Sequence, residues 1–140
     1  GLRFHPDGRL IIADARKGLL AMSPAGQLET LLTEAGGVKL GFTDDVDVSS
    51  TGIIYFSDAS SKFGYGRELL DVLEGAGHGR LIAFDPRNRQ ATVLLSGLGF
   101  ANGVALSADE SFVLVNETSK TRIRRYWLKG PKAGSDDLFF

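Results

Sequence analysis

Three stretches of the chain repeat one pattern of apolar residues and turns, and this repeat limits what the chain can fold into. An offset of 44 residues matches the first copy with the second and places Asp14 on Asp58. An offset of 58 residues matches the second copy with the third and places Val46 on Val104. Repeats of 20 to 50 residues indicate architectures built from one recurring structural unit. We place the copies at about residues 1–43, 44–100 and 101–140.

Each copy contains four apolar clusters of strand length separated by turn sequences, such as HPDG at residues 5–8 and SADE at residues 107–110. Proline presets φ for a turn, and glycine accepts positive φ. Four strands in a repeat of roughly 40 residues are typical of a β-propeller blade. A β-sandwich is the alternative, but a sandwich gives no reason for the sequence to repeat in phase. We therefore predict an all-β chain of the six-bladed propeller type, with about three blades present.

The second copy carries an insertion at about residues 61–78. Its segment 67–74 places Leu69, Leu70 and Leu73 on one helical face, with glycines on both sides. We predict a short helix. Two roles remain open: packing against the edge of a blade, or forming a lid over one end of the propeller.

Composition excludes several classes of function. Among 140 residues, 16 basic residues face 17 acidic ones, so the chain lacks the charge of a nucleic-acid-binding protein. No apolar run approaches the 18 residues of a membrane span, and no signal pattern is visible. The absence of cysteine excludes a disulfide framework, thiol catalysis and zinc–thiolate sites. The chain begins without methionine and ends on two phenylalanines, so we expect it to be part of something longer.

Two polar residues are candidates for a metal site. In a propeller the first strand of each blade lines the central channel, and the residues at its start point into the channel mouth. Asp44 occupies this position in the second copy and Asn102 in the third. Oxygen donors from several blades are what a Ca²⁺ site requires. The alternative is that Asn102 only stabilises the turn before Gly103.

The carboxylates of Asp44, Asp45 and Asp47 are crowded within four residues. Crowding either raises a pKa or attracts a cation. The other interpretation is a polar strand face that pairs with arginines of a neighbouring blade.

A second polar position recurs at the end of the second strand, where the sequence aligns Asp14, Asp58 and Asn116. A residue repeated in every blade indicates a structural turn device rather than a catalyst. Asn116 also begins an Asn-Glu-Thr glycosylation sequon, and we expect burial in a strand to block it. The catalytic residues stay unassigned.

The segments FTDDVDVSSTGIIYFSDASSKF, GLGFANGVALSADESFVLVNET and RYWLKGPKAG resemble the strictosidine synthase-like family, the plant members most closely and the adipocyte plasma-membrane-associated protein more distantly. The resemblance implies a six-bladed propeller, of which this chain is about half. More distant six-bladed relatives are calcium-dependent hydrolases that use asparagine at the positions of Asp44 and Asn102. Strictosidine synthase itself works without metal, through a glutamate in a late blade beyond Phe140.

The resemblance implies a hydrolase of the esterase or lactonase type, acting on small-molecule esters, with Ca²⁺ as cofactor of the full-length protein. Two alternatives remain open: an amine–aldehyde condensing enzyme of alkaloid biosynthesis, and a non-catalytic binding propeller. The expected partners are a small-molecule substrate and either the missing blades or a second copy of the chain. The family resemblance implies the secretory pathway, the vacuole or the lumen of the endoplasmic reticulum.

Overall fold

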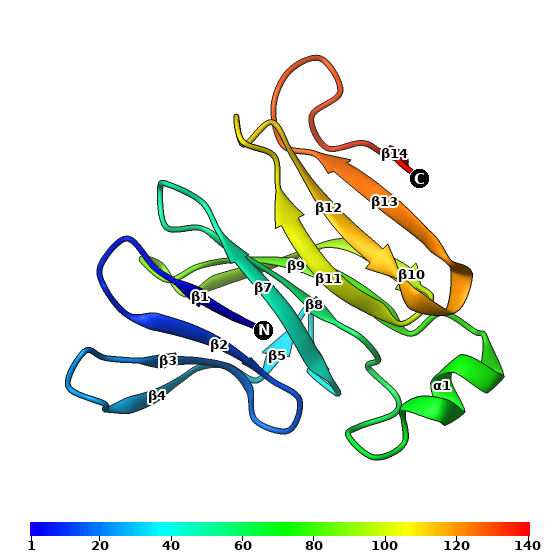
Figure 1. Ribbon diagram of the computed structural model, residues 1–140, viewed down its shortest axis with the longest axis horizontal. Coiled ribbons are helices and arrows are strands. Elements are labelled where there is room, and N and C mark those ends of the chain that lie inside the picture. Colours follow the sequence, from blue (N-terminus) through cyan, green and yellow to red (C-terminus); the bar gives the residue numbers. More distant parts are fainter.

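The computed structural model describes all 140 residues and contains three consecutive four-stranded antiparallel sheets (Figure 1). The predicted all-β fold is thereby confirmed, and the β-sandwich is not observed. The sheets are sheet 1, with β1 (Leu2–Phe4), β2 (Leu10–Asp14), β3 (Gly18–Met22) and β4 (Leu28–Leu32); sheet 2, with β7 (Thr43–Val48), β8 (Ile54–Asp58), β9 (Gly79–Asp85) and β10 (Gln90–Leu98); and sheet 3, with β11 (Ala101–Leu106), β12 (Phe112–Glu117), β13 (Arg122–Trp127) and β14 (Asp136–Leu138).

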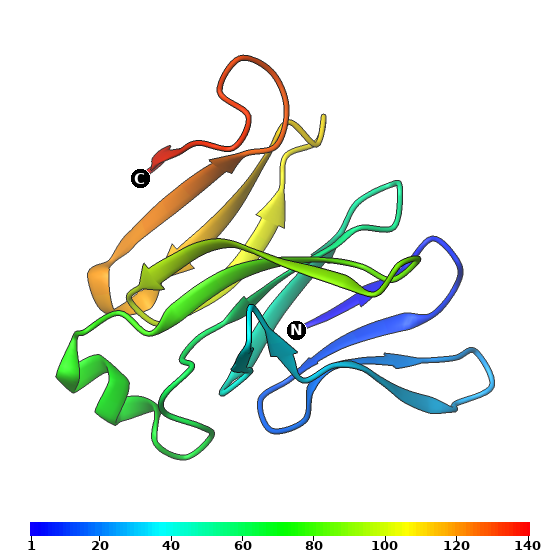
Figure 2. The same cartoon turned by 180° about the vertical axis from the view of Figure 1, so that it is seen from behind.

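The first strands of the three sheets lie next to one another. Strand β7 contacts β1 on one side and β11 on the other. The remaining strands of each sheet lead away from this shared edge, as the view from behind also shows (Figure 2). The strands β1, β7 and β11 therefore form one inner surface, as expected for adjacent blades.

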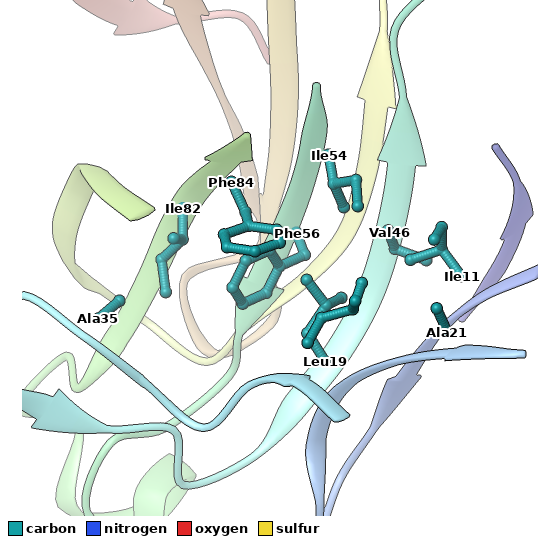
Figure 3. Close-up of a cluster of buried hydrophobic side chains, with 10 residues drawn as sticks. Ile11, Leu19, Ala21, Ala35, Val46, Ile54, Phe56, Ile82 and Phe84 are labelled. Atoms are coloured by element: carbon teal, nitrogen blue, oxygen red, sulfur yellow. The ribbon is translucent and has the colours of Figure 1, made fainter. Parts of the chain in front are cut away.

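Sheet 2 lies between sheets 1 and 3, so both of its faces are covered. Successive residues of a strand point to opposite faces, and a strand of sheet 2 can therefore contribute to two cores. On β8, Ile54 and Phe56 enter a core shared with sheet 1, whereas Tyr55 enters a core shared with sheet 3. Figure 3 shows this first core. It is completed by residues of both sheets and by Ala35, which lies between β4 and β7: Ile11, Leu19, Ala21, Leu31, Ala35, Val46, Ile82 and Phe84.

The strand register corrects the sequence alignment of the third copy. Val46 pairs with Phe56 between β7 and β8, whereas Val104 pairs with Val115 between β11 and β12. The inner strands therefore correspond at an offset of 58 residues, but the second strands correspond at 59.

The cause is a longer turn in the third copy. In the second copy the backbone N–H of Ser49 donates to the oxygen of Ile53, whereas in the third copy the N–H of Ser107 donates to the oxygen of Phe112. The third turn thus contains one additional residue, which shifts the residues of β12 by one position relative to those of β8.

This shift changes which residue occupies the repeated polar position. Glu117, not Asn116, stands where Asp58 stands in sheet 2, so the predicted equivalence of Asp58 and Asn116 is wrong. Asn116 instead points to the uncovered face of sheet 3 and is exposed, so the expected burial of the sequon is also wrong for this chain.

Three elements lie outside the four-stranded sheets, and the shortest of them is the 3-10 helix η1 (Thr118–Lys120) between β12 and β13. A hairpin of β5 (Glu34–Ala35) and β6 (Val38–Lys39), which the sequence did not predict, joins sheets 1 and 2. The predicted helix is confirmed as α1 (Glu68–Glu74), and Gly75 ends it with φ of +65°.

The leucines of α1 do not pack against the blade edge. Leu69 is 67% exposed and Leu73 is 73% exposed, whereas Asp71 is the only buried residue of the helix. The Asp71 carboxylate accepts a hydrogen bond of 2.5 Å from the Ser60 hydroxyl. A polar anchor therefore holds the helix, and its apolar face is left open.

Candidate metal-binding site

The two candidate ligands lie in bulges of neighbouring inner strands. The pairing of β7 with β8 is interrupted between Thr43 and Val46, and the pairing of β11 with β12 is interrupted between Ala101 and Val104. Asp44 and Asn102 are located inside these interruptions. Bulges redirect side chains and are frequent beside active sites. The structure thus gives both residues the same local backbone irregularity in adjacent strands.

Neither candidate side chain has a polar partner. Asp44 is partly buried, and its side chain makes no hydrogen bond or ion pair. Its backbone oxygen accepts a hydrogen bond from the amino group of Gly1. Burial raises the pKa of Asp44, the nearby charge of Asp45 raises it further, and the Gly1 amino group opposes both effects. Asn102 is also partly buried, and its side chain makes no hydrogen bond. The oxygen atoms of both side chains are therefore available to a ligand.

The neighbouring carboxylates are already engaged between blades. Asp45 accepts a hydrogen bond of 2.8 Å from the backbone N–H of Val104, and Asp47 accepts one of 2.8 Å from that of Leu106. Asp47 also pairs with Arg3 of sheet 1 at 2.8 Å. The interpretation as a polar strand face paired with arginines of a neighbouring blade therefore holds for Asp47, whereas the partner of Asp45 in the neighbouring blade is a backbone N–H group. Asp44 is the one acid of this group that remains free.

The chain by itself does not complete a metal shell. No group of three or more His, Cys, Asp or Glu side chains is placed to hold a metal ion. Because Ca²⁺ takes six to eight oxygen ligands, Asp44 and Asn102 fit as two members of a larger set.

An aromatic cluster that was not predicted from the sequence borders the two bulges. Phe42 and Phe100 directly precede β7 and β11, and their ring centroids are 5.7 Å apart. Tyr65 of the insertion stacks on Phe42 at 6.2 Å, and the guanidinium of Arg16 lies 4.3 Å from the centre of the Tyr65 ring. The Gly-Phe dipeptide before both β7 and β11 is the signal that could have identified this cluster.

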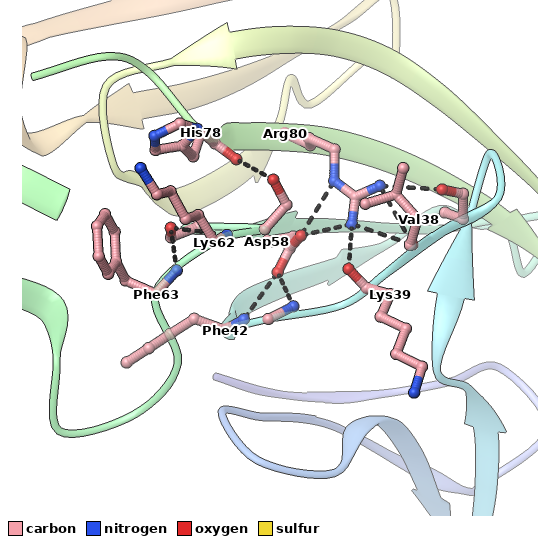
Figure 4. A network of polar contacts seen from close by, with 12 residues as sticks. Val38, Lys39, Phe42, Asp58, Lys62, Phe63, His78 and Arg80 are labelled. Atoms are coloured by element: carbon pink, nitrogen blue, oxygen red, sulfur yellow. Dashed lines mark hydrogen bonds and ion pairs between the residues drawn. The ribbon is translucent and has the colours of Figure 1, made fainter.

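A buried ion pair fixes the approach to β7 (Figure 4). The Asp58 carboxylate accepts hydrogen bonds from the backbone N–H groups of Gly41, at 3.0 Å, and Phe42, at 2.9 Å. Arg80 donates to the same carboxylate at 2.6 Å and to the carbonyl oxygen of Lys39 at 3.0 Å. The Asp58 carboxylate and the Arg80 guanidinium are thus paired with each other, and together they hold the chain before β7.

Glu117 performs the same task in sheet 3. Its buried carboxylate accepts a hydrogen bond of 2.8 Å from the backbone N–H of Gly99 and pairs with Arg122 and, at 3.3 Å, with Lys120. In sheets 2 and 3 the repeated acid is therefore a structural device that orders the entry to an inner strand. Asp14 of sheet 1 instead accepts hydrogen bonds from the backbone N–H groups of Arg16 and Lys17, in the turn that follows β2.

The ion pairs of Glu117 predict that the stability of the fold depends on pH. Burial alone would raise the pKa of Glu117, but hydrogen bonds from Arg122, Gly99 and Lys120 outweigh it, so the pKa lies below its ordinary value of 4.5. A lowered folded-state pKa stabilises the fold above pH 4.5, and this stabilisation is lost as the pH falls through the folded-state pKa. We expect the difference in unfolding free energy between wild type and Glu117→Gln to be constant above pH 4.5 and to narrow below it. Urea titrations at several pH values measure this difference. A difference that does not change with pH would contradict the lowered pKa of Glu117.

Similarity to known proteins covers nearly the whole chain. The sequence model of the strictosidine synthase family matches residues 44–131. Strictosidine synthase-like protein 10 of Arabidopsis thaliana is 50% identical over 142 residues, which cover 99% of this chain and 38% of the relative. The rat adipocyte plasma membrane-associated protein is 42% identical, with coverage of 99% and 38%. The chain therefore spans less than half of the length of these relatives.

Solved structures support the same fold. A gluconolactonase from Xanthomonas campestris superposes with a TM-score of 0.78 at 22% identity, covering 99% of this chain and 47% of that one. The calcium-binding protein regucalcin from Agrobacterium tumefaciens superposes with a TM-score of 0.68 at 17% identity, with coverage of 99% and 43%. None of the helices in the structure has the length and apolar character needed to cross a membrane.

Proposed function

Because the chain belongs to the strictosidine synthase family, we propose that it forms part of a propeller that hydrolyses small-molecule esters or lactones beside a bound Ca²⁺. Asp44 and Asn102 are the two ligands that this chain would supply. The observation that carries the proposal is their placement in matching bulges of adjacent inner strands, with no polar partner for either side chain. The names of two solved relatives in fold, a gluconolactonase and a calcium-binding protein, support this choice of chemistry.

The residues around the bulges have distinct tasks in this proposal. Asp45 would hold the two bulges together through the hydrogen bond that its carboxylate accepts from the backbone N–H of Val104. Phe42 and Phe100 would exclude water from one side of the site. The metal, when bound, would polarise the carbonyl group of the ester.

The test uses the full-length protein, since two oxygen donors do not make a Ca²⁺ site. We expect Asp44→Ala and Asn102→Ala each to weaken Ca²⁺ binding at least about 10-fold, the lower end of the loss caused by removing even an outer-shell group. Isothermal calorimetry measures the affinity, and hydrolysis of a panel of lactones and aryl esters measures activity. Glu29→Ala, an exposed acid far from the inner strands, is the matched control.

Normal Ca²⁺ binding and hydrolysis by both site variants would overturn the proposal. The same preparation should be assayed for condensation of an amine with an aldehyde, because the plant relatives carry the name strictosidine synthase-like. Condensation without Ca²⁺ would favour that alternative, and inactivity in both assays would favour a binding propeller.

The compartment of the whole protein is part of the proposal. The name of the rat relative, a plasma membrane-associated protein, is consistent with the secretory pathway or the vacuole. Microscopy of the full-length protein with a fluorescent tag tests this placement, and a diffuse cytosolic signal would contradict it.

A further inference from the structure

The aromatic cluster beside the two bulges continues as one row of contacts across the chain. Phe100 contacts Phe42, and Phe42 stacks on Tyr65 of the insertion. The guanidinium of Arg16, in the turn between β2 and β3, lies over the Tyr65 ring. This turn, the insertion and the starts of β7 and β11 gather on one side of the molecule, at the bottom of Figure 1. Sheets 1, 2 and 3 thus each contribute to the row, and this chain forms it by itself.

The turn that carries Arg16 is fixed beside the cluster. The Asp14 carboxylate accepts hydrogen bonds from the backbone N–H groups of Arg16, at 2.9 Å, and Lys17, at 2.8 Å. Ala15 packs against the buried aromatic rings of the cluster. The backbone of Arg16 is therefore held in place, and its long side chain reaches to Tyr65, which is 56% exposed.

The side chain of Arg16 has no acidic partner. It forms no ion pair and no hydrogen bond, and it lies 4.3 Å from the centre of the Tyr65 ring. A guanidinium carries five N–H donors in a planar fork that matches the two oxygens of a carboxylate. The ring attracts the positive charge but offers these donors no acceptor oxygen. The donors of Arg16 are therefore available to a ligand.

The other arginines of the chain show that this is an exception. Every arginine except Arg16 and Arg67 pairs with an aspartate or a glutamate. Arg67 belongs to the insertion, and its guanidinium lies 5.6 Å from the centre of the Phe63 ring. The two arginines without an acidic partner thus both contact aromatic rings of the insertion. Uncompensated positive charge beside a site attracts anionic substrates.

We propose that Arg16, held on Tyr65, binds a carboxylate group of the substrate, so that the proposed hydrolase selects esters or lactones that carry a negative charge. The inference rests on the proposed function for the reaction, but binding of the carboxylate does not require hydrolysis. Phe42 and Phe100 each precede a candidate ligand by two residues. Their rings lie against the apolar part of the substrate, between its charged end at Arg16 and its ester group at the bulges.

The test uses the full-length protein and two amides that differ in one carboxylate, hexanamide and adipamic acid. An amide in place of the ester allows binding to be measured without turnover. We expect the wild type to bind adipamic acid at least about 10-fold more tightly than hexanamide, as measured by isothermal calorimetry, because hydrogen bonds to a charged group are strong. Arg16→Gln should remove this preference. Arg16→Lys should restore only part of it, because lysine keeps the charge but not the planar fork.

Three further variants isolate the cause. Tyr65→Ala removes the ring that holds the guanidinium, so the preference should fall, whereas Tyr65→Phe keeps the ring and should keep the preference. Arg87→Gln is the matched control, because Arg87 is an exposed arginine between β9 and β10 that pairs with Asp85 at 2.8 Å. It should leave both affinities unchanged. Circular dichroism verifies that each variant keeps its strands.

Equal binding of the two amides by the wild type, including no detectable binding of either, would overturn the inference. A preference that survives Arg16→Gln would also overturn it, because the carboxylate would then bind elsewhere. Hydrolysis of 4-nitrophenyl hexanoate and of the 4-nitrophenyl half-ester of adipic acid tests the reaction separately. If neither ester is hydrolysed but the preference for adipamic acid depends on Arg16, the proposed hydrolase is wrong and the carboxylate site is supported.

Discussion

Asp58→Ala should destabilise the chain by about 3–5 kcal/mol, because it removes one partner of a buried ion pair and leaves the other charged. Asp58 is fully buried, and Arg80 is 6% exposed. The substitution leaves the guanidinium of Arg80 without its carboxylate and the backbone N–H groups of Gly41 and Phe42 without an acceptor. Urea unfolding followed by circular dichroism measures the change in unfolding free energy.

Two further variants isolate the cause of this effect. Asp58→Asn keeps an acceptor for the backbone groups but removes the charge, so its loss should be smaller than that of Asp58→Ala. Glu29→Ala removes an acid whose contacts with Arg9 and Arg89 are longer, at 3.6 and 3.8 Å, and exposed, so its effect should stay within about 0.5 kcal/mol. Equal losses for Asp58→Ala and Glu29→Ala would show that burial of the pair does not matter.

Phe56→Ala should destabilise the chain by about 3–5 kcal/mol, the range for large-to-small substitutions of a buried aromatic residue. Phe56 is fully buried in the core between sheets 1 and 2. Its loss opens a cavity between the two sheets, beside Val46 and Ile82 of the adjacent strands, and the surrounding structure relaxes into such a cavity only in part. The same urea titration measures this change.

Leu69→Ala on α1 is the control, because it removes an apolar side chain that is not buried. Leu69 is 67% exposed, so its removal should change the unfolding free energy by no more than about 0.5 kcal/mol. A loss for Phe56→Ala below about 1 kcal/mol would mean that the core between sheets 1 and 2 is not formed as described.

The repeated pattern of strands and turns was sufficient to predict the architecture. Four apolar clusters per copy, punctuated by turn residues, predicted four strands per sheet, and three in-phase copies predicted three sheets. The helix at Glu68–Glu74 followed from helical spacing and flanking glycines. These features are local, so they depend on which residues follow one another and not on what packs against them.

Long-range contacts decided which polar residues occupy equivalent positions and which of them are paired. An additional residue in one turn moved Asn116 out of the repeated acid position and brought Glu117 into it, which only the strand register reveals. Among three adjacent acids, only the contacts between blades show that Asp45 and Asp47 are engaged and that Asp44 is free.

The candidate site itself was predicted in part. The sequence by itself determined that Asp44 and Asn102 stand at equivalent places in the repeat, because the offset between inner strands is a property of the sequence. Only the tertiary structure decided that both places are bulges, that Phe42, Phe100 and Tyr65 border them, and that the leucines of α1 are exposed. The physical reason is that burial and side-chain pairing depend on residues tens of positions apart, whereas strand and turn preferences depend on immediate neighbours.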